Sequence, residues 1–267
     1  MHLDVVDLLE FYKLPLGRVV REAVQAKILD IWADAPGHRV AGIGFATPYL
    51  RPFMAKAERV IALMPGPQGV APWPRNEPNR AALVPEAMLA LSDASIDRAL
   101  LVHSLEMADN PRDVLRDVWR VLSPGGRILV VVPNRTGLWA RTDSTPFGFG
   151  RPYSRGQLTH LLRDVMFSPL EWREALMMPP LFKRPRRATA KAWERIGGKL
   201  WPAFSGVIMV EAEKQLYQGV TARAKSSRQL RPIFAPQGAF STRDAIPDTR
   251  GRQPEDAKAG SWTRIRP

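Results

Sequence analysis

The stretch that most constrains this chain covers residues 91–134, where two short apolar runs flank an amphipathic segment. Residues 96–102 are too few for a confident helix and are typical of a strand buried on both faces. Asn110 and Pro111 then supply an N-cap and a first-turn proline for a helix with one apolar face. The Pro-Gly-Gly of residues 124–126 stops that helix, and residues 128–132 form a second buried strand. A strand–helix–strand unit of this length predicts a parallel sheet.

The remaining segments extend this α/β pattern in both directions. Residues 3–34 have apolar residues at helical spacing, and Pro15 with Gly17 divides them into two helices. Ser154 and Gln157 form a capping box that opens a helix over residues 157–167. Further strands are predicted at Val40 in the stretch 38–50 and over residues 59–63, 81–84, 172–180 and 205–215. We therefore divide the chain into a helical lead-in (1–34), an α/β domain (35–217) and a tail (218–267) that is predicted to be disordered.

Composition excludes several classes of site. There is no cysteine, so a thiol nucleophile, a disulfide and a cysteine metal site are all ruled out. The four histidines form no ligand-spaced cluster, and we expect no metal. Apolar runs stop far short of the roughly 20 residues of a membrane span. We expect no membrane span and a cytoplasmic location.

The net charge of +13 is unevenly distributed. Residues 1–182 hold 21 Lys and Arg against 19 Asp and Glu, so the body is close to neutral. The positive charge gathers in residues 183–201 and in the tail. These segments are either solvated basic surface or a contact for nucleic acid or an anionic membrane. An RNA-directed role is one hypothesis that follows.

Two motifs in the central stretch carry a family resemblance. Residues 93–97, Asp-Ala-Ser-Ile-Asp, enter one strand, and residues 120–126, Arg-Val-Leu-Ser-Pro-Gly-Gly, enter the next. In this order they resemble the second half of a class I S-adenosylmethionine-dependent methyltransferase domain of the small-molecule type. The resemblance covers roughly residues 35–215. It implies a Rossmann-like fold with a seven-stranded, mostly parallel sheet and helices on both faces, and S-adenosylmethionine as the cofactor.

The resemblance assigns the first cofactor-binding turn to residues 40–48. Gly42 replaces the family's acidic residue, Gly44 keeps the first glycine, and Ala46 replaces the second. Pro48 stands at the third glycine and removes an N–H from the turn. An alternative interpretation takes Gly42, Gly44 and Thr47 as a degraded dinucleotide fingerprint. Under either interpretation Gly42, Gly44, Ala46 and Thr47 are predicted to contact the cofactor.

The next two strand ends depart further from the family pattern. Both cofactor interpretations call for an acidic residue at the end of the second strand, where Leu63 and Met64 stand instead. After the third strand the family commonly has an acid that contacts adenine. Pro85 occupies that position and Glu86 follows it, as a substitute acceptor. We predict that Leu63, Met64, Pro85 and Glu86 line the cofactor site.

His103 follows the fourth strand, where the substrate pocket of such a fold opens. It is predicted to contact the cofactor and to act as a general base, the alternative being a structural role in the pocket wall. Substrate contacts are predicted for four residues of the lead-in helices and of the loop after the fifth strand. They are Tyr12, Trp139, Arg151 and Tyr153. For the aromatic ones, packing in the core is the alternative interpretation.

The loop over residues 64–79 is rich in Pro and Gly. Its Gln68 and Trp73 either contact a ligand or partner or belong to a stiffened insertion.

Two functional hypotheses remain beside the RNA-directed one. The first is S-adenosylmethionine-dependent methyl transfer to an unidentified acceptor, driven by alignment of the nucleophile with the methyl group. The second is a catalytically degenerate member of the same fold, which acts as a binding or regulatory partner. The departures at Gly42, Ala46, Pro48, Met64 and Pro85 favour the second, because all of them lie on the cofactor side.

Overall fold

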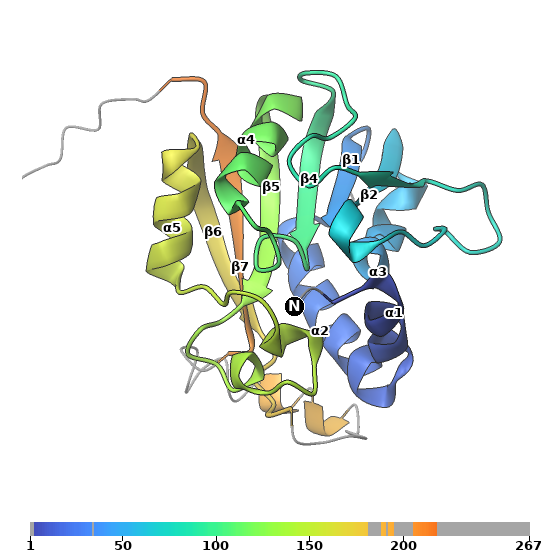
Figure 1. The fold of residues 1–267 in the computed structure, drawn as a ribbon, viewed down its shortest axis with the longest axis vertical. Helices are drawn as coiled ribbons and strands as arrows, with labels where there is room; N and C mark the ends of the chain where they lie inside the picture. The colour runs from blue at the N-terminus through green and yellow to red at the C-terminus, as the bar shows by residue number, and fades with distance from the viewer. Residues whose placement is uncertain (1–2, 34, 181–187, 191, 195–204, 218–267) are drawn as a thin grey trace, which may run out of the picture. The chain divides into compact units, whose positions relative to one another are not determined.

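A seven-stranded mixed sheet forms the centre of the structure, which is a computed structural model describing residues 3–33, 35–180, 188–190, 192–194 and 205–217 (Figure 1). The strands are β1 (Arg39–Gly44), β2 (Arg59–Pro65), β3 (Ala81–Val84), β4 (Ile96–Val102), β5 (Leu122–Pro133), β6 (Phe167–Ala175) and β7 (Val207–Lys214). Their order across the sheet is β3-β2-β1-β4-β5-β7-β6. The first five strands are parallel, and β7 runs antiparallel between β5 and β6. The predicted fold class is confirmed.

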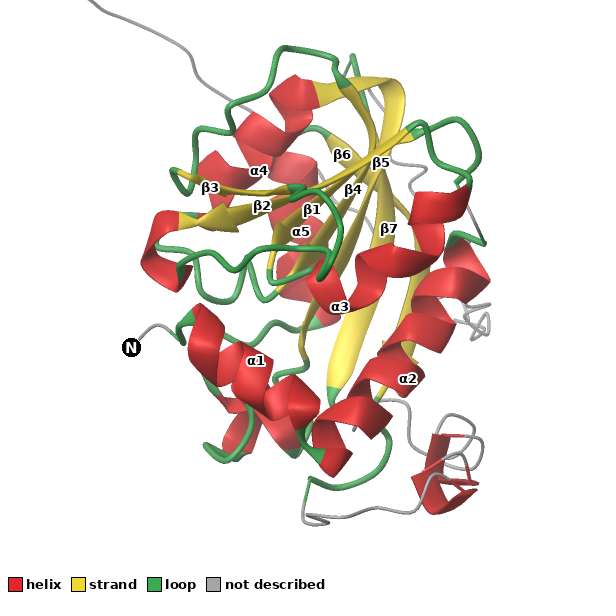
Figure 2. Ribbon diagram, turned by 90° about the vertical axis from the view of Figure 1, so that its right-hand side faces the viewer, coloured by secondary structure: helices red, strands yellow, loops and turns green. Residues whose placement is uncertain are grey.

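Helices cover both faces of the sheet. They are α1 (Val5–Lys13), α2 (Pro15–Ile31), α3 (Thr47–Leu50), α4 (Pro111–Val121) and α5 (Arg155–Asp164), and short 3₁₀ turns are η1 (Arg51–Ala55), η2 (Gly66–Gln68), η3 (Trp139–Arg141) and η4 (Pro146–Gly148). The first three helices lie on one face, and α4 and α5 lie on the other (Figure 2). Each face has its own apolar core, because successive side chains of a strand point to opposite faces.

Caps recognisable in the sequence set several helix ends. Asn110 accepts a hydrogen bond from Arg112 N, and Pro111 opens α4. The Ser154–Gln157 capping box forms with both of its hydrogen bonds. Pro15 opens α2, directly after the break that follows α1. The division of residues 3–34 into two helices is thus confirmed at Pro15.

Two predicted boundaries near α5 are wrong. The helix predicted over residues 157–167 ends at Asp164, and the strand predicted over 172–180 is β6, Phe167–Ala175. Met166 takes a positive φ of 63° between them and turns the chain directly into the strand. Phe167 then pairs with Lys214 of β7. The antiparallel partner therefore sets where β6 begins.

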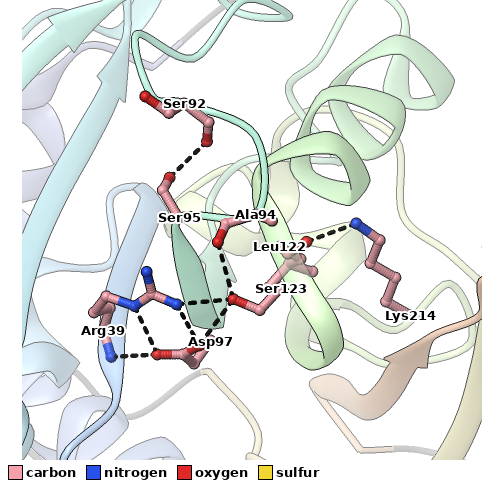
Figure 3. A network of polar contacts seen from close by, with 8 residues as sticks. All are labelled: Arg39, Ser92, Ala94, Ser95, Asp97, Leu122, Ser123 and Lys214. Atoms are coloured by element: carbon pink, nitrogen blue, oxygen red, sulfur yellow. Dashed lines mark hydrogen bonds and ion pairs between the residues drawn. The ribbon is translucent and has the colours of Figure 1, made fainter.

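A polar network joins the strands at their amino ends (Figure 3). Arg39 donates to Asp97 from its backbone N at 2.9 Å, from Nε at 3.0 Å and from Nη2 at 2.8 Å. The Ser123 hydroxyl accepts from Arg39 Nη2 and lies 2.9 Å from Asp97 Oδ1. These hydrogen bonds, Arg39's side chain above all, hold the pKa of the Asp97 carboxyl well below its usual range. Asp97 of the first family motif thus ties β1 and β4 to Ser123 at the start of β5.

The second motif also holds the scaffold. Arg120 donates to the carbonyls of Leu89 and Leu91 at 3.0 and 2.9 Å, and to the Asp93 and Asp117 carboxylates. These bonds fix the loop between β3 and β4 against α4.

No helix among the described residues is both long and apolar enough to cross a membrane. Most of the basic segment 183–201 and the whole tail 218–267 lie outside the described residues. The predicted nucleic-acid contact and the predicted disorder therefore stay predictions.

Candidate functional site

Residues with an unusual backbone conformation lie where β1 and β4 end. Gly44 has φ of +77°, and a Cβ placed on it would lie 2.4 Å from Val102 O and 2.8 Å from His103 O. Only glycine fits there, because the turn after β1 runs against the backbone of β4. His103 itself has φ of +48°, which is uncommon outside glycine. Such a conformation persists only where its surroundings enforce it, and it clusters at functional sites.

A buried hydrogen-bond chain converges on the His103 ring. Tyr12 Oη, from α1, lies 2.9 Å from His103 Nε2 and 2.9 Å from Tyr49 Oη. All three side chains are buried. Burial raises the pKa of the Tyr12 phenol well above its ordinary value, and it also raises the pKa of Tyr49. Both phenols therefore keep their protons across the neutral pH range.

Glu106 lies on the other side of the ring. Its Oε1 is 3.4 Å from His103 Nδ1, an electrostatic contact longer than a hydrogen bond, and its Oε2 accepts from Ser104 N at 3.2 Å. Since a carboxylate only accepts, it favours the proton on Nδ1 and leaves Nε2 as an acceptor facing Tyr12. His103 is thus held between a carboxylate and a phenol.

Aromatic rings enclose this polar chain. Tyr12 stacks on Phe45, with ring centroids 5.7 Å apart and an interplanar angle of 28°. Phe147 of η4 lies 5.0 Å from the His103 ring and packs edge-on to Phe11 and Trp139. The cluster draws on α1, the turn after β1, the end of β4 and the loop after β5. It is apolar with few polar groups, as small-molecule sites are.

Gln68 of η2 reaches this cluster from the end of β2. Its Nε2 donates to the His103 carbonyl at 2.9 Å, and the residue is 5% exposed. This bond fixes the amide orientation, because the flipped amide would set two oxygens against each other. Oε1 of Gln68 is left buried without a hydrogen-bond partner among the described residues. A buried acceptor without a partner is costly, which points to a ligand donor.

The residues predicted for the cofactor turn lie together, but the protein's own side chains fill the space beside them. A Cβ on Gly42 would lie 2.6 Å from Leu50 Cδ1 and 2.8 Å from Ala46 Cβ. The acidic residue of the family pattern would therefore clash at this position. Ala46 is fully buried, and Thr47 begins α3, a helix of four residues.

The other predicted cofactor residues are spread over three places. Met64 is fully buried in the core beneath α1 and α2, whereas Leu63 faces the opposite core beneath α4. Pro85 is exposed after β3. Glu86 accepts a hydrogen bond from Asp109 N at 3.2 Å, in the loop that precedes α4. The structure therefore does not gather these four side chains at one point.

The predicted substrate residues are also divided. Tyr12 lies on His103, and Trp139 reaches it through Phe147 while donating from Nε1 to Met178 O at 2.7 Å. Tyr153 donates to Leu105 O at 3.2 Å, and desolvation raises its pKa to about 12. Arg151 is exposed, and only its backbone N–H bonds inward, to Glu106 O. Among these four predicted substrate residues, Tyr12 has a direct hydrogen bond to His103.

The sequence alone predicts no role for Tyr49, places Glu106 only where the substrate pocket opens, and leaves Gln68 between two interpretations. Tyr49 meets Tyr12 across 37 positions, and Gln68 meets His103 across 35, so neither pairing has a local pattern. Only the His-to-Glu spacing of three residues was visible in the sequence, as a separation that also brings side chains together in a turn.

A cleft lies at the same edge of the sheet, near the start of α5. This cleft of about 460 Å³ is lined by residues from the end of β5, the start of α5, β6 and β7. They are Asn134, Thr136, Ser154, Arg155, Gly156, Glu174 and Ile208. Arg155 pairs with Glu174, so the charges in the cleft balance each other.

Comparison with known proteins bears on this geometry. Residues 40–130 match a family model described as a methyltransferase domain. No match is found among curated proteins. A solved structure from Thermotoga maritima, described as an S-adenosylmethionine-dependent methyltransferase and possible histamine N-methyltransferase, superposes with a TM-score of 0.54 at 16% identity. That match covers 79% of this chain and 96% of the other.

Two further structures share the fold at low identity. The [4+2]-cyclase SpnF has a TM-score of 0.50 at 21% identity, over 73% of this chain and 80% of that one. YcgJ from Bacillus subtilis has a TM-score of 0.50 at 14% identity, over 72% and 97%. Such similarities establish the fold and leave the activity open. Residues 40–130 thus match a methyltransferase domain model, and the chain shares the fold of solved structures described as S-adenosylmethionine-dependent methyltransferases.

Proposed function

We propose that this protein binds S-adenosylmethionine where β1, β2 and β4 end and methylates a small acceptor beside His103. The observation that carries the proposal is Gln68, whose buried Oε1 has no hydrogen-bond partner among the described residues. It lies at the carboxyl edge of the sheet, the edge at which open α/β sheets bind ligands.

The residues at this edge offer the cofactor a different hydrogen-bond acceptor from the one in the family pattern. The hydroxyl and amino groups of S-adenosylmethionine need acceptors, and Gln68 Oε1 is a buried one. A neutral amide replaces the charged carboxylate of the family pattern. Because hydrogen bonds to charged groups are worth about 1.5–3 kcal/mol and neutral ones nearer 1, we expect affinity roughly tenfold weaker than with a carboxylate.

When bound, the cofactor would supply an electrophilic methyl group. His103 would supply the base: with Nδ1 facing Glu106, Nε2 can take a proton from a hydroxyl or amine held beside it. Glu106 stabilises the resulting imidazolium, and the aromatic cluster excludes water from the ring.

Calorimetric titration with S-adenosylhomocysteine tests binding directly. Gln68→Glu keeps an oxygen acceptor but loses the donor to His103 O, whereas Gln68→Met loses both. We expect Gln68→Met to weaken binding by about tenfold and Gln68→Glu to bind better than Gln68→Met. Gln25→Met, on the middle of α2, is the matched control and should bind like wild type. No heat at millimolar ligand with folded wild-type protein would reject the proposal.

One observation favours the alternative, a degenerate member that acts as a binding partner. The protein's own side chains already take up much of the site: Tyr12 occupies His103 Nε2, and Leu50 and Ala46 fill the space over Gly42. The same fold occurs in a protein described as a cyclase, so the architecture alone does not require methyl transfer. In that case S-adenosylhomocysteine would leave the protein's melting temperature unchanged.

A further inference from the structure

The ring of Tyr12 occupies a site that the sheet edge builds without it. Phe45 lies in the turn that follows β1, Tyr49 in the short helix α3 and His103 directly after β4, whereas Tyr12 comes from α1. Phe45 provides a stacking surface for the ring, and Phe11 and Tyr49 pack edge-on to it. His103 Nε2 and Tyr49 Oη both meet its hydroxyl at 2.9 Å. These groups recognise a phenol.

The orientation of His103 matters here. Nδ1 faces Glu106, so Nε2 is the ring nitrogen turned toward the aromatic cluster. His103 can take a proton from the group that is hydrogen-bonded to its Nε2. In this structure that group is the hydroxyl of Tyr12, whose raised pKa keeps it neutral. Tyr12 therefore has the position and the protonation state of a phenolic substrate before it reacts.

Helix α1 is attached to the sheet edge in a way that allows it to withdraw. Its backbone hydrogen bonds, among the described residues, run within the helix or into the break before α2. Among the described residues, its side-chain hydrogen bonds to the rest of the domain are the two made by Tyr12. Otherwise buried Leu8, Phe11 and Tyr12 hold it by apolar packing. The exposed Leu14 and the following Pro15 form the break about which it can turn.

We propose that the place now taken by the Tyr12 ring is the acceptor subsite, that its ligand is a small phenol, and that α1 is a lid which this ligand displaces. The inference rests on the proposed function for its role but concerns a separate binding event. The ligand's hydroxyl would donate to His103 Nε2 and its ring would stack on Phe45. Ligands without a hydroxyl would lose the bond to Nε2 and compete poorly with Tyr12.

The test uses 4-methylphenol as the probe, with toluene as the analogue that lacks the hydroxyl. Tyr12→Phe keeps the ring but removes the hydroxyl that competes for Nε2. Because two neutral hydrogen bonds no longer have to be broken, we expect 4-methylphenol to bind this variant about tenfold more tightly than wild type. Tyr153→Phe is the matched control, since its hydroxyl bonds to Leu105 O, and its affinity should equal that of wild type.

Nitrogen NMR of the His103 side chain provides a second measurement that needs no variant. In wild type, 4-methylphenol should shift the Nε2 resonance, and toluene at the same concentration should not. Equal affinity of wild type and Tyr12→Phe, together with an unmoved Nε2 resonance, would overturn the inference. A protein that binds 4-methylphenol but not S-adenosylhomocysteine would refute the proposed methyl transfer and leave this subsite standing.

Discussion

The two edges of the sheet differ in how far their polar groups are hydrogen-bonded. At the amino edge, Arg39, Asp97 and Ser123 satisfy one another across three strands. At the carboxyl edge, Gln68 keeps an oxygen that has no partner in the described part of the chain, and His103 holds a left-handed backbone conformation. A saturated network contributes to stability, whereas strain and unmet hydrogen bonds reduce it and persist at sites that bind ligands. The difference separates the edge that builds the fold from the edge that is available for chemistry.

The largest effect is expected at the junction of the two strands that carry the site. In Gly44→Ala, the added Cβ meets the Val102 and His103 carbonyls at 2.4 and 2.8 Å, and these backbone atoms cannot yield. Together with the positive φ, we expect a loss of about 3–4 kcal/mol in the free energy of unfolding. Urea denaturation measures it. Gly156→Ala, where the nearest atom is 4.0 Å away, is the control and should change little.

Asp97→Asn probes the amino edge and should rank next. Losing the charge weakens three hydrogen bonds from Arg39, so we expect a loss of about 3 kcal/mol. The matched control is Asp164→Asn, whose partner Arg112 is 54% exposed, and it should cost less than about 1 kcal/mol. Equal losses in the two variants would contradict the comparison of the edges.

The Asp97 contribution should also depend on pH. Its pKa is lowered in the folded state, so its stabilising effect is present above the unfolded value of about 3.9 and fades as pH falls toward the folded value. Wild type and Asp97→Asn should therefore differ fully at pH 7 and by less at pH 3, in denaturant titrations at both values.

Of these variants, controls aside, His103→Asn is expected to change stability least, and it tests the contrast between the two edges of the sheet most directly. Asparagine tolerates positive φ, so the backbone strain is no greater, but the buried hydrogen bond to Tyr12 is lost, and we expect about 1–2 kcal/mol of destabilisation. Under the proposed function, methyl transfer should nevertheless fall by roughly 10²–10⁴-fold as the base is removed. Stability loss as large as in Asp97→Asn, with no separate effect on turnover, would make His103 a structural residue.

The same contrast explains what could be predicted from the sequence. The Asp93–Asp97 and Arg120–Gly126 motifs are local, and their residues hold the scaffold, so the parallel sheet and the capped helices could be predicted. The carboxyl edge depends on contacts between distant segments, such as Tyr12 with His103 across 91 positions. No periodicity encodes such a pairing. The start of β6 escaped prediction for the same reason, because its partner lies far along the chain in β7.

The position of β7 has a consequence for the order in which the protein can assemble during synthesis. β5 and β6 leave the ribosome before β7, yet β6 joins the sheet only through β7, which also pairs with the outer edge of β5. Until Val207–Lys214 has emerged, both strands present open edges, and open edges are where nascent chains pair wrongly. A chain arrested before residue 207 should therefore need protection by a chaperone, while the parallel half of the sheet is already complete.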